Sequence, residues 1–89
     1  MLKISISELS TRSVTLRLDG QISGKWVLLL QTICDVPLNQ AMRVVIDLQH
    51  VSFADCDGIV LLRSLTNRGV ELLKPLPFIE EQIKAEASR

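Results

Sequence analysis

The most informative part of this sequence is the stretch VVIDLQHVSFADCDGIVLL, residues 44–62. Its first three residues are β-branched and apolar, which is typical of a strand buried on both faces. A polar connection follows, and an apolar helix is then predicted to begin at Asp57 or Gly58. Two carboxylates, those of Asp55 and Asp57, therefore flank the thiol of Cys56 where that helix begins.

The segments before this stretch predict a hairpin and a helix. Residues 2–7 and 14–18 alternate apolar and polar side chains, which indicates two half-buried antiparallel strands, the second ending at Asp19-Gly20. A helix is then expected, with Ser23 as its N-cap and an end near Pro37. Its inner face is predicted from helical spacing to carry Trp26, Leu29, Leu30 and Ile33.

The segments after it predict another strand and a third helix. Residues 67–69 form a helix stop, with Gly69 suited to a left-handed conformation, and residues 70–73 form a strand. Pro77 is expected at the first position of a short helix. The order predicts an α/β fold in one domain, residues 1–89, with a mixed sheet of about four strands and three helices packed against it.

Composition excludes several classes of function. The 89 residues are 47% hydrophobic, and ten basic side chains balance ten acidic ones, so nucleic acid and anionic membranes are not expected partners. The two cysteines, Cys34 and Cys56, and the single histidine do not form a zinc motif, and we expect neither a metal nor another cofactor. Without a signal peptide or an apolar segment long enough to insert into a membrane, a cytoplasmic domain with reduced thiols is expected.

The Asp55–Gly58 turn has an enzymatic and a structural interpretation. A strand followed by Asp-x-Asp-Gly also describes phosphatases of the haloacid dehalogenase type, in which Asp55 would attack phosphorus, Asp57 would handle the proton and Mg²⁺ would neutralise charge. This alternative is disfavoured, because no aspartate follows Asp57 to complete the metal site. Either carboxylate could instead serve only to cap the helix.

Residues 44–59 also resemble the central motif of the STAS domain, named for sulphate transporters and anti-sigma factor antagonists. In that family an apolar strand ends in Asp-Leu, passes an apolar-x-Phe step and reaches Asp-Ser-Ser-Gly before a helix. Residues 14–22, 68–72 and 77–79 resemble further family segments in the same order. The terminal strand and helix of longer members have no counterpart in this sequence, which would leave a sheet edge open and makes a homodimer one of the alternatives.

The resemblance implies a binding module that does no catalysis. Family members that act as anti-sigma factor antagonists bind a serine kinase, which phosphorylates the first Ser of the motif and breaks the complex. Mapped here, Asp55 and Gly58 keep the family residues, Cys56 takes the phosphorylated position and Asp57 replaces the second Ser. The usual switch should then be absent, and Asp57 would supply a permanent negative charge. A redox-active Cys56 is the alternative to a small side chain that fits where Ser would.

The interpretation we adopt is a protein-interaction module in a regulatory, partner-switching assembly of the signalling and transcription-regulating type. Its expected partner is an anti-sigma factor or a serine-kinase-like regulator. The expected binding surface is the loop Asp55–Gly58 with Ile59, Val60 and Arg63 on the exposed side of the helix, where Asp55 shapes the turn and Gly58 permits a close approach. The alternative within the same family is a subunit of a membrane lipid-transport ATPase complex.

Overall fold

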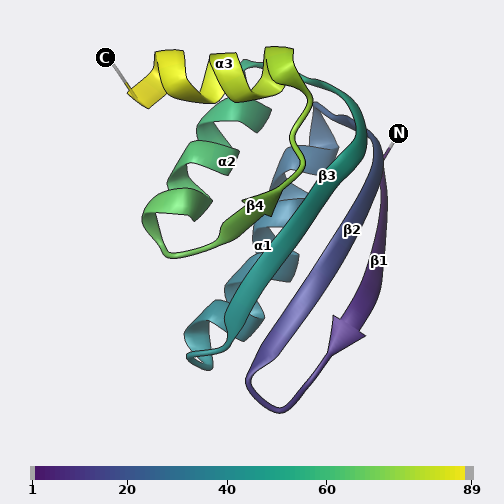
Figure 1. The fold of residues 1–89 in the computed structure, drawn as a ribbon, viewed down its shortest axis with the longest axis vertical. Helices are drawn as coiled ribbons and strands as arrows, with labels where there is room; N and C mark the ends of the chain where they lie inside the picture. Colours follow the sequence, from purple (N-terminus) through teal and green to yellow (C-terminus); the bar gives the residue numbers. More distant parts are fainter. Residues whose placement is uncertain (1, 88–89) are drawn as a thin grey trace.

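A computed structural model describes residues 2–87 of the chain. The chain begins with a hairpin of two strands, after which helices and strands alternate, giving four strands and three helices in residues 2–87 (Figure 1). The elements are β1 (Leu2–Leu9), β2 (Ser13–Ile22), α1 (Lys25–Asn39), β3 (Arg43–Ala54), α2 (Cys56–Asn67), β4 (Glu71–Leu73) and α3 (Pro77–Ala87). The α/β fold with a four-stranded mixed sheet and three helices is the one that the sequence predicts.

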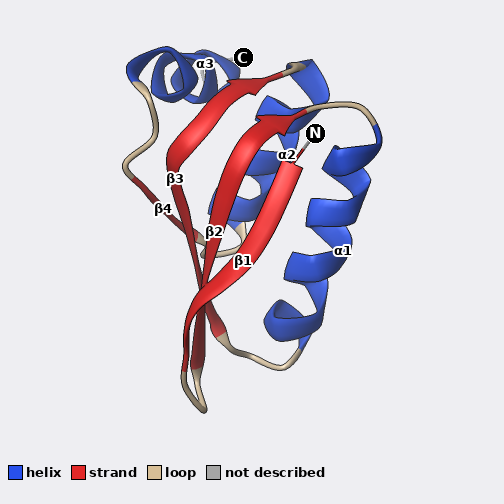
Figure 2. Ribbon diagram, turned by 90° about the vertical axis from the view of Figure 1, so that its right-hand side faces the viewer, coloured by secondary structure: helices blue, strands red, loops and turns tan. Residues whose placement is uncertain are grey.

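The sheet has the strand order β1-β2-β3-β4. β1 and β2 are antiparallel, whereas β2 pairs with β3 and β3 with β4 in parallel. Both parallel connections step in the same direction across the sheet, so right-handed crossovers place α1 and α2 on the same face. Figure 2 shows these two helices together on one side of the strands, while α3 lies near one end of the sheet and packs on α2.

The core lies between that face of the sheet and the helices. Eleven of the large side chains are less than 2% exposed. They come from the inner face of β2 and β3 and from all three helices. They are Leu18, Ile22, Leu30, Cys34, Val44, Ile46, Leu48, Val51, Leu62, Leu65 and Ile79. Burial of such residues is the main favourable term in folding, and it explains the apolar spacing of the sequence.

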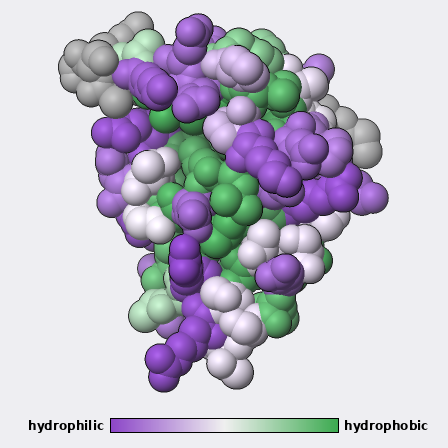
Figure 3. Space-filling view, in the orientation of Figure 1, coloured by the Kyte–Doolittle hydropathy of each residue, from purple (hydrophilic) through white to green (hydrophobic). Residues whose placement is uncertain are grey.

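The other face of the sheet has no helix against it. Figure 3 shows apolar side chains along the middle of the view of Figure 1, with hydrophilic ones on both sides. Val45 points to this face and is still only 9% exposed, because it lies between Thr15 of β2 and Glu71 of β4. An ion pair of 2.8 Å from Arg43 Nη2 holds the Glu71 carboxylate in place. The prediction that the start of β3 is buried on both faces is confirmed.

Two strands are longer than predicted. β2 passes through Asp19-Gly20 to Ile22, and Gly20 absorbs the irregularity with a φ of 113° between two shifts of register. β3 includes the polar residues that were expected to form a connection, up to Ala54. The turn signals are overridden because the added residues of the two strands pair with each other, Gln21 with Phe53 and Ile22 with Ala54, and local composition does not reveal this pairing.

The entry of α1 and its buried stripe also differ from the prediction. Gly24, not Ser23, occupies the N-cap position, and no side chain caps this helix. The fully buried residues of α1 are Leu30 and Cys34, whereas Leu29 is 42% exposed. The helix therefore turns a narrower face to the sheet than its run of leucines suggests.

Candidate functional site

Asp55 joins the two loops at the carboxyl ends of β2 and β3. Its Oδ1 accepts a hydrogen bond of 2.7 Å from the Gly58 N–H, and its Oδ2 accepts one of 3.0 Å from the Gly24 N–H. Its own N–H donates to the carbonyl of Ile22 at 3.1 Å. One side chain therefore caps α2 and also fixes the start of α1, so the entries of the two helices are held together.

Gly58 is required by the closeness of β2 to the first turn of α2. A Cβ at this position would lie 2.6 Å from the carbonyl oxygen of Ile22 and 3.1 Å from Cγ2 of the same residue. The obstacle is backbone, which cannot rotate away as a side chain can. The group that approaches Gly58 closely in the structure is the neighbouring strand of the chain itself.

Cys56 and Asp57 form the exposed first turn of α2. Asp55 is the N-cap, so the helix begins at Cys56, slightly earlier than predicted. Both side chains are exposed, and Asp57 is the one acidic residue of the first turn. A negative charge at this position is stabilised by the unpaired N–H groups and the helix dipole. The capping interpretation is thus confirmed for Asp55.

The two cysteines differ sharply in environment. Cys34 is 0% exposed, and burial raises the pKa of its thiol from 9.0 to about 11. The carboxylate of Asp35 acts in the same direction, and Arg68, which pairs with Asp35 at 2.6 Å, acts against it. Cys34 is therefore an inert core residue, whereas Cys56 is free and exposed.

One residue of the expected binding surface lies inside the protein. Ile59 is 5% exposed and belongs to the core, so its expected place on the outer side of α2 is wrong. It lies three residues before Leu62, and helical spacing puts the two on the same inner face. Val60 is 48% exposed and Arg63 is partly exposed. We call Cys56, Asp57, Val60 and Arg63 the α2 entry surface.

The arrangement does not suit the phosphatase chemistry considered above. Both oxygens of Asp55 are held by backbone N–H groups, in a capping role that ties down the proposed nucleophile. Within residues 2–87, no group of three or more His, Cys, Asp or Glu side chains converges as a metal site would require. Nor does any helix of this part of the chain have the length and apolarity to cross a membrane.

Gly24 is the residue that sequence inspection missed. Its N–H donates the second hydrogen bond to the carboxylate of Asp55, which lies 31 residues later in the sequence. Its φ of 56° and ψ of −132° describe a backbone conformation open mainly to glycine. The Ser23-Gly24 pair marks a turn, but no local pattern shows which side chain the turn will meet.

Comparisons with known proteins place the fold. No protein-family model matches the chain, and no curated protein matches its sequence. Among solved structures, the anti-sigma factor antagonist SpoIIAA in its unphosphorylated form is similar with a TM-score of 0.76 and 18% identity, over 92% of this chain and 82% of that chain. SpoIIAA of Bacillus in the phosphorylated form gives a TM-score of 0.75 at 17% identity, over 94% and 83% of the two chains.

A third similar structure carries the domain name directly. It is the STAS domain of an antisigma-factor antagonist from Rhodobacter sphaeroides, with a TM-score of 0.65 and 22% identity over 82% of this chain and 86% of that chain. The order of strands and helices and the Asp55–Gly58 turn at the start of α2 agree with the resemblance seen in the sequence. The chain has the SpoIIAA-like fold of STAS domains.

Proposed function

We propose that this protein is a non-catalytic interaction module that binds a regulatory protein through the α2 entry surface, as anti-sigma factor antagonists do. Support comes from the SpoIIAA-like fold, at a TM-score of 0.76, and from the construction of the surface itself. The cytoplasm is the proposed location, and signalling or regulation of transcription the proposed setting.

The observation that carries the proposal is the contrast between a fixed base and exposed side chains. Asp55 and Gly58 hold the turn through two hydrogen bonds and a close backbone approach. On this base, Cys56 and Asp57 are exposed, with no hydrogen bond or ion pair from either side chain within residues 2–87. A rigid turn that presents unengaged polar side chains next to the exposed Val60 is suited to protein recognition.

The chemistry of the surface favours a module with a fixed charge. If Cys56 occupies the position of the phosphorylated serine, a serine kinase has no hydroxyl to modify there. Asp57 places a permanent charge of −1 at the start of α2, against about −1.5 to −2 for a phosphoserine. The partner is thus expected to read the charge of Asp57 without a phosphorylation cycle at Cys56.

Affinity purification from the native cell extract tests the proposal. The tagged wild-type chain is compared with Asp57→Lys and with a matched control, Asn67→Lys, which adds the same side chain to the exposed far end of the same helix. Mass spectrometry is expected to find an anti-sigma factor or serine-kinase-like protein whose recovery falls with Asp57→Lys and not with Asn67→Lys. Equal recovery with both variants would place the binding surface elsewhere.

Two further outcomes separate the alternatives. A lipid-transport ATPase as the main partner would contradict the regulatory role in favour of a transport subunit. If a serine kinase is recovered, the Cys56→Ser variant is expected to take up phosphate from ATP with this kinase, and the wild-type chain is not. Phosphate on the wild-type chain at another residue of the turn would contradict the fixed-charge mechanism.

A further inference from the structure

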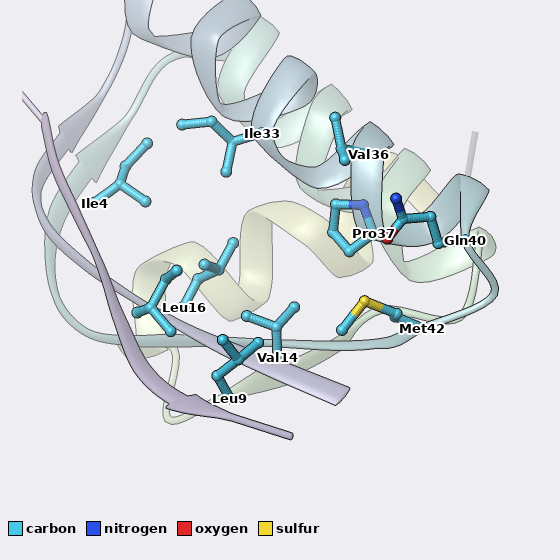
Figure 4. Close-up of a pocket in the computed structure, with 10 residues that line it drawn as sticks. Ile4, Leu9, Val14, Leu16, Ile33, Val36, Pro37, Gln40 and Met42 are labelled. Atoms are coloured by element: carbon cyan, nitrogen blue, oxygen red, sulfur yellow. The ribbon is translucent and has the colours of Figure 1, made fainter. Parts of the chain in front are cut away.

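An apolar opening lies on the side of β1, away from the α2 entry surface. A groove of about 400 Å³ separates the edge of the sheet from the second half of α1. Figure 4 shows side chains of the sheet and of α1 facing one another across it. The residues that matter here are Ile4, Ile6 and Leu9 on β1, and Ile33, Val36 and Pro37 on α1.

The groove is apolar and poorly covered. Three of the side chains that line it are strongly exposed: Ile6 to 61%, Leu9 to 67% and Val36 to 59%. Exposed large apolar residues that cluster in this way usually mark an interface. β1 is also an edge strand, and Figure 2 shows it nearest the viewer, with no other described element outside it. Both the side chains and the backbone edge are thus open.

The charges on β1 show what could cover this edge. Lys3 and Glu8 lie opposite Asp19 and Thr15 of β2, on the face that carries no helix. They stand near opposite ends of the strand, and neither forms an ion pair within residues 2–87. If a second β1 paired in antiparallel orientation, Lys3 of each strand would lie near Glu8 of the other. In parallel orientation, the two Lys3 side chains would lie together, and so would the two Glu8 side chains.

We propose that β1 pairs in antiparallel orientation with β1 of a second copy of this chain, extending the sheet across a twofold axis. Pairing centred on Ser5 places Ile4 opposite Ile6 of the second copy and Lys3 next to Glu8 of the second copy. The inner faces of the two sheets then point the same way. The two grooves join, and Val36 of each α1 covers the shared apolar layer.

The size of the contact is compatible with a modest homodimer. Seven residues of strand edge per copy, from Leu2 to Glu8, and the three exposed apolar side chains of the groove would bury on the order of 1,000 Å² in the pair, close to the lower limit of specific interfaces. We therefore expect a dissociation constant on the order of micromolar. The opposite edge, β4, has three residues only and offers a much shorter ladder.

Edge strands are often protected by a charge or a bulge that prevents pairing. β1 has an irregularity between Ile6 and Glu8, and it carries charges. The segment before this irregularity is regular, and it contains the centre of the proposed pairing. Because the two charges have opposite signs, they oppose most partners but match a second copy of the same strand.

A charge-swap experiment tests this interface. Sedimentation velocity over micromolar to submillimolar concentrations is expected to show a monomer–dimer equilibrium for the wild-type chain. Lys3→Glu and Glu8→Lys should each raise the dissociation constant roughly tenfold, because like charges then meet twice across the twofold axis. The double variant, Lys3→Glu with Glu8→Lys, should restore the wild-type value, which a simple loss of folding would not do.

Three results would overturn the inference. They are a wild-type chain that is monomeric throughout, a dimer that neither single variant weakens, and a double variant no better than the single ones. Ile6→Ser provides a second check, since it should weaken the dimer without changing charge. Asp57→Lys should leave dimerisation unchanged, so this inference and the proposed function can fail independently.

Discussion

The most informative perturbation is the removal of the Asp55 carboxylate. Asp55→Ala takes the acceptor from two backbone N–H groups, those of Gly58 at 2.7 Å and Gly24 at 3.0 Å. Loss of an N-cap costs about 1 kcal/mol, within a range of roughly 0.5–2 kcal/mol. The second hydrogen bond contributes about 1 kcal/mol more. The free energy of unfolding should therefore fall by about 2 kcal/mol, a large part of the roughly 5–15 kcal/mol of an ordinary domain.

Asp57 supplies the matched control. It is an aspartate in the same turn, but its side chain accepts no hydrogen bond within residues 2–87. Asp57→Ala loses a favourable interaction with the helix dipole of about 0.3–1 kcal/mol and gains a few tenths of a kcal/mol or more in helix propensity. These terms nearly cancel. Asp55→Asn should fall between the two, because its amide keeps an acceptor for one N–H and offers a donor to the other.

Urea unfolding measures the series. The single tryptophan, Trp26, lies next to the Gly24 turn and reports through fluorescence, with circular dichroism as the independent probe. The expected order of destabilisation is Asp55→Ala, then Asp55→Asn, then Asp57→Ala near zero. Equal effects of Asp55→Ala and Asp57→Ala would refute the argument that Asp55 holds the two loops together.

Three further predictions concern the core and the thiols. Gly58→Ala should lower the free energy of unfolding by about 1–3 kcal/mol, because the new Cβ would meet the Ile22 carbonyl oxygen at 2.6 Å. This loss outweighs a gain of about 1 kcal/mol in helix propensity. In urea unfolding, the control Ser64→Ala on the same helix should be close to neutral. Below pH 9.0 the thiol of Cys34 is protonated in both states, but between 9.0 and about 11, the range set by its raised pKa, only the unfolded chain loses the proton. In this pH range, the free energy of unfolding of the wild-type chain should therefore fall more steeply than that of Cys34→Ala, by up to about 1.4 kcal/mol per pH unit. Urea unfolding of both proteins at each pH measures the difference. With a maleimide, mass spectrometry should find Cys56 modified in the native protein and Cys34 only after unfolding; labelling of Cys56 no faster than that of an ordinary exposed cysteine would end the redox-sensor alternative.

Much of the fold follows from apolar spacing along the sequence. Alternation identifies β1 and β2, and the β-branched run identifies β3 as a central strand. The capping role of Asp55 is also visible, because an aspartate after a strand and before an apolar helix is a typical N-cap. Even the misplaced residue had a signal: Ile59 precedes Leu62 by three positions, and that spacing indicates a shared buried face.

The rest depends on contacts between distant segments. No local pattern of the sequence indicates that the Asp55 carboxylate reaches the Gly24 N–H. Nor does one indicate that β2 passes close enough to α2 to exclude a Cβ at residue 58. The extent of β3 depends likewise on its ladder with β2, which continues to Ala54, because β4 pairs only with Val45 to Asp47. Such features follow from packing, so a single sequence predicts them poorly.

The structure also divides the four residues of the turn into two classes. Asp55 and Gly58, which agree with the STAS motif, are the two that the fold requires, since one joins the loops and the other admits the Ile22 carbonyl. Cys56 and Asp57, which depart from it, have exposed side chains that the fold leaves free. Agreement with the motif is therefore explained by folding alone. The binding experiment therefore changes Asp57 and Cys56, whose exposed side chains the fold does not require, and leaves Asp55 intact.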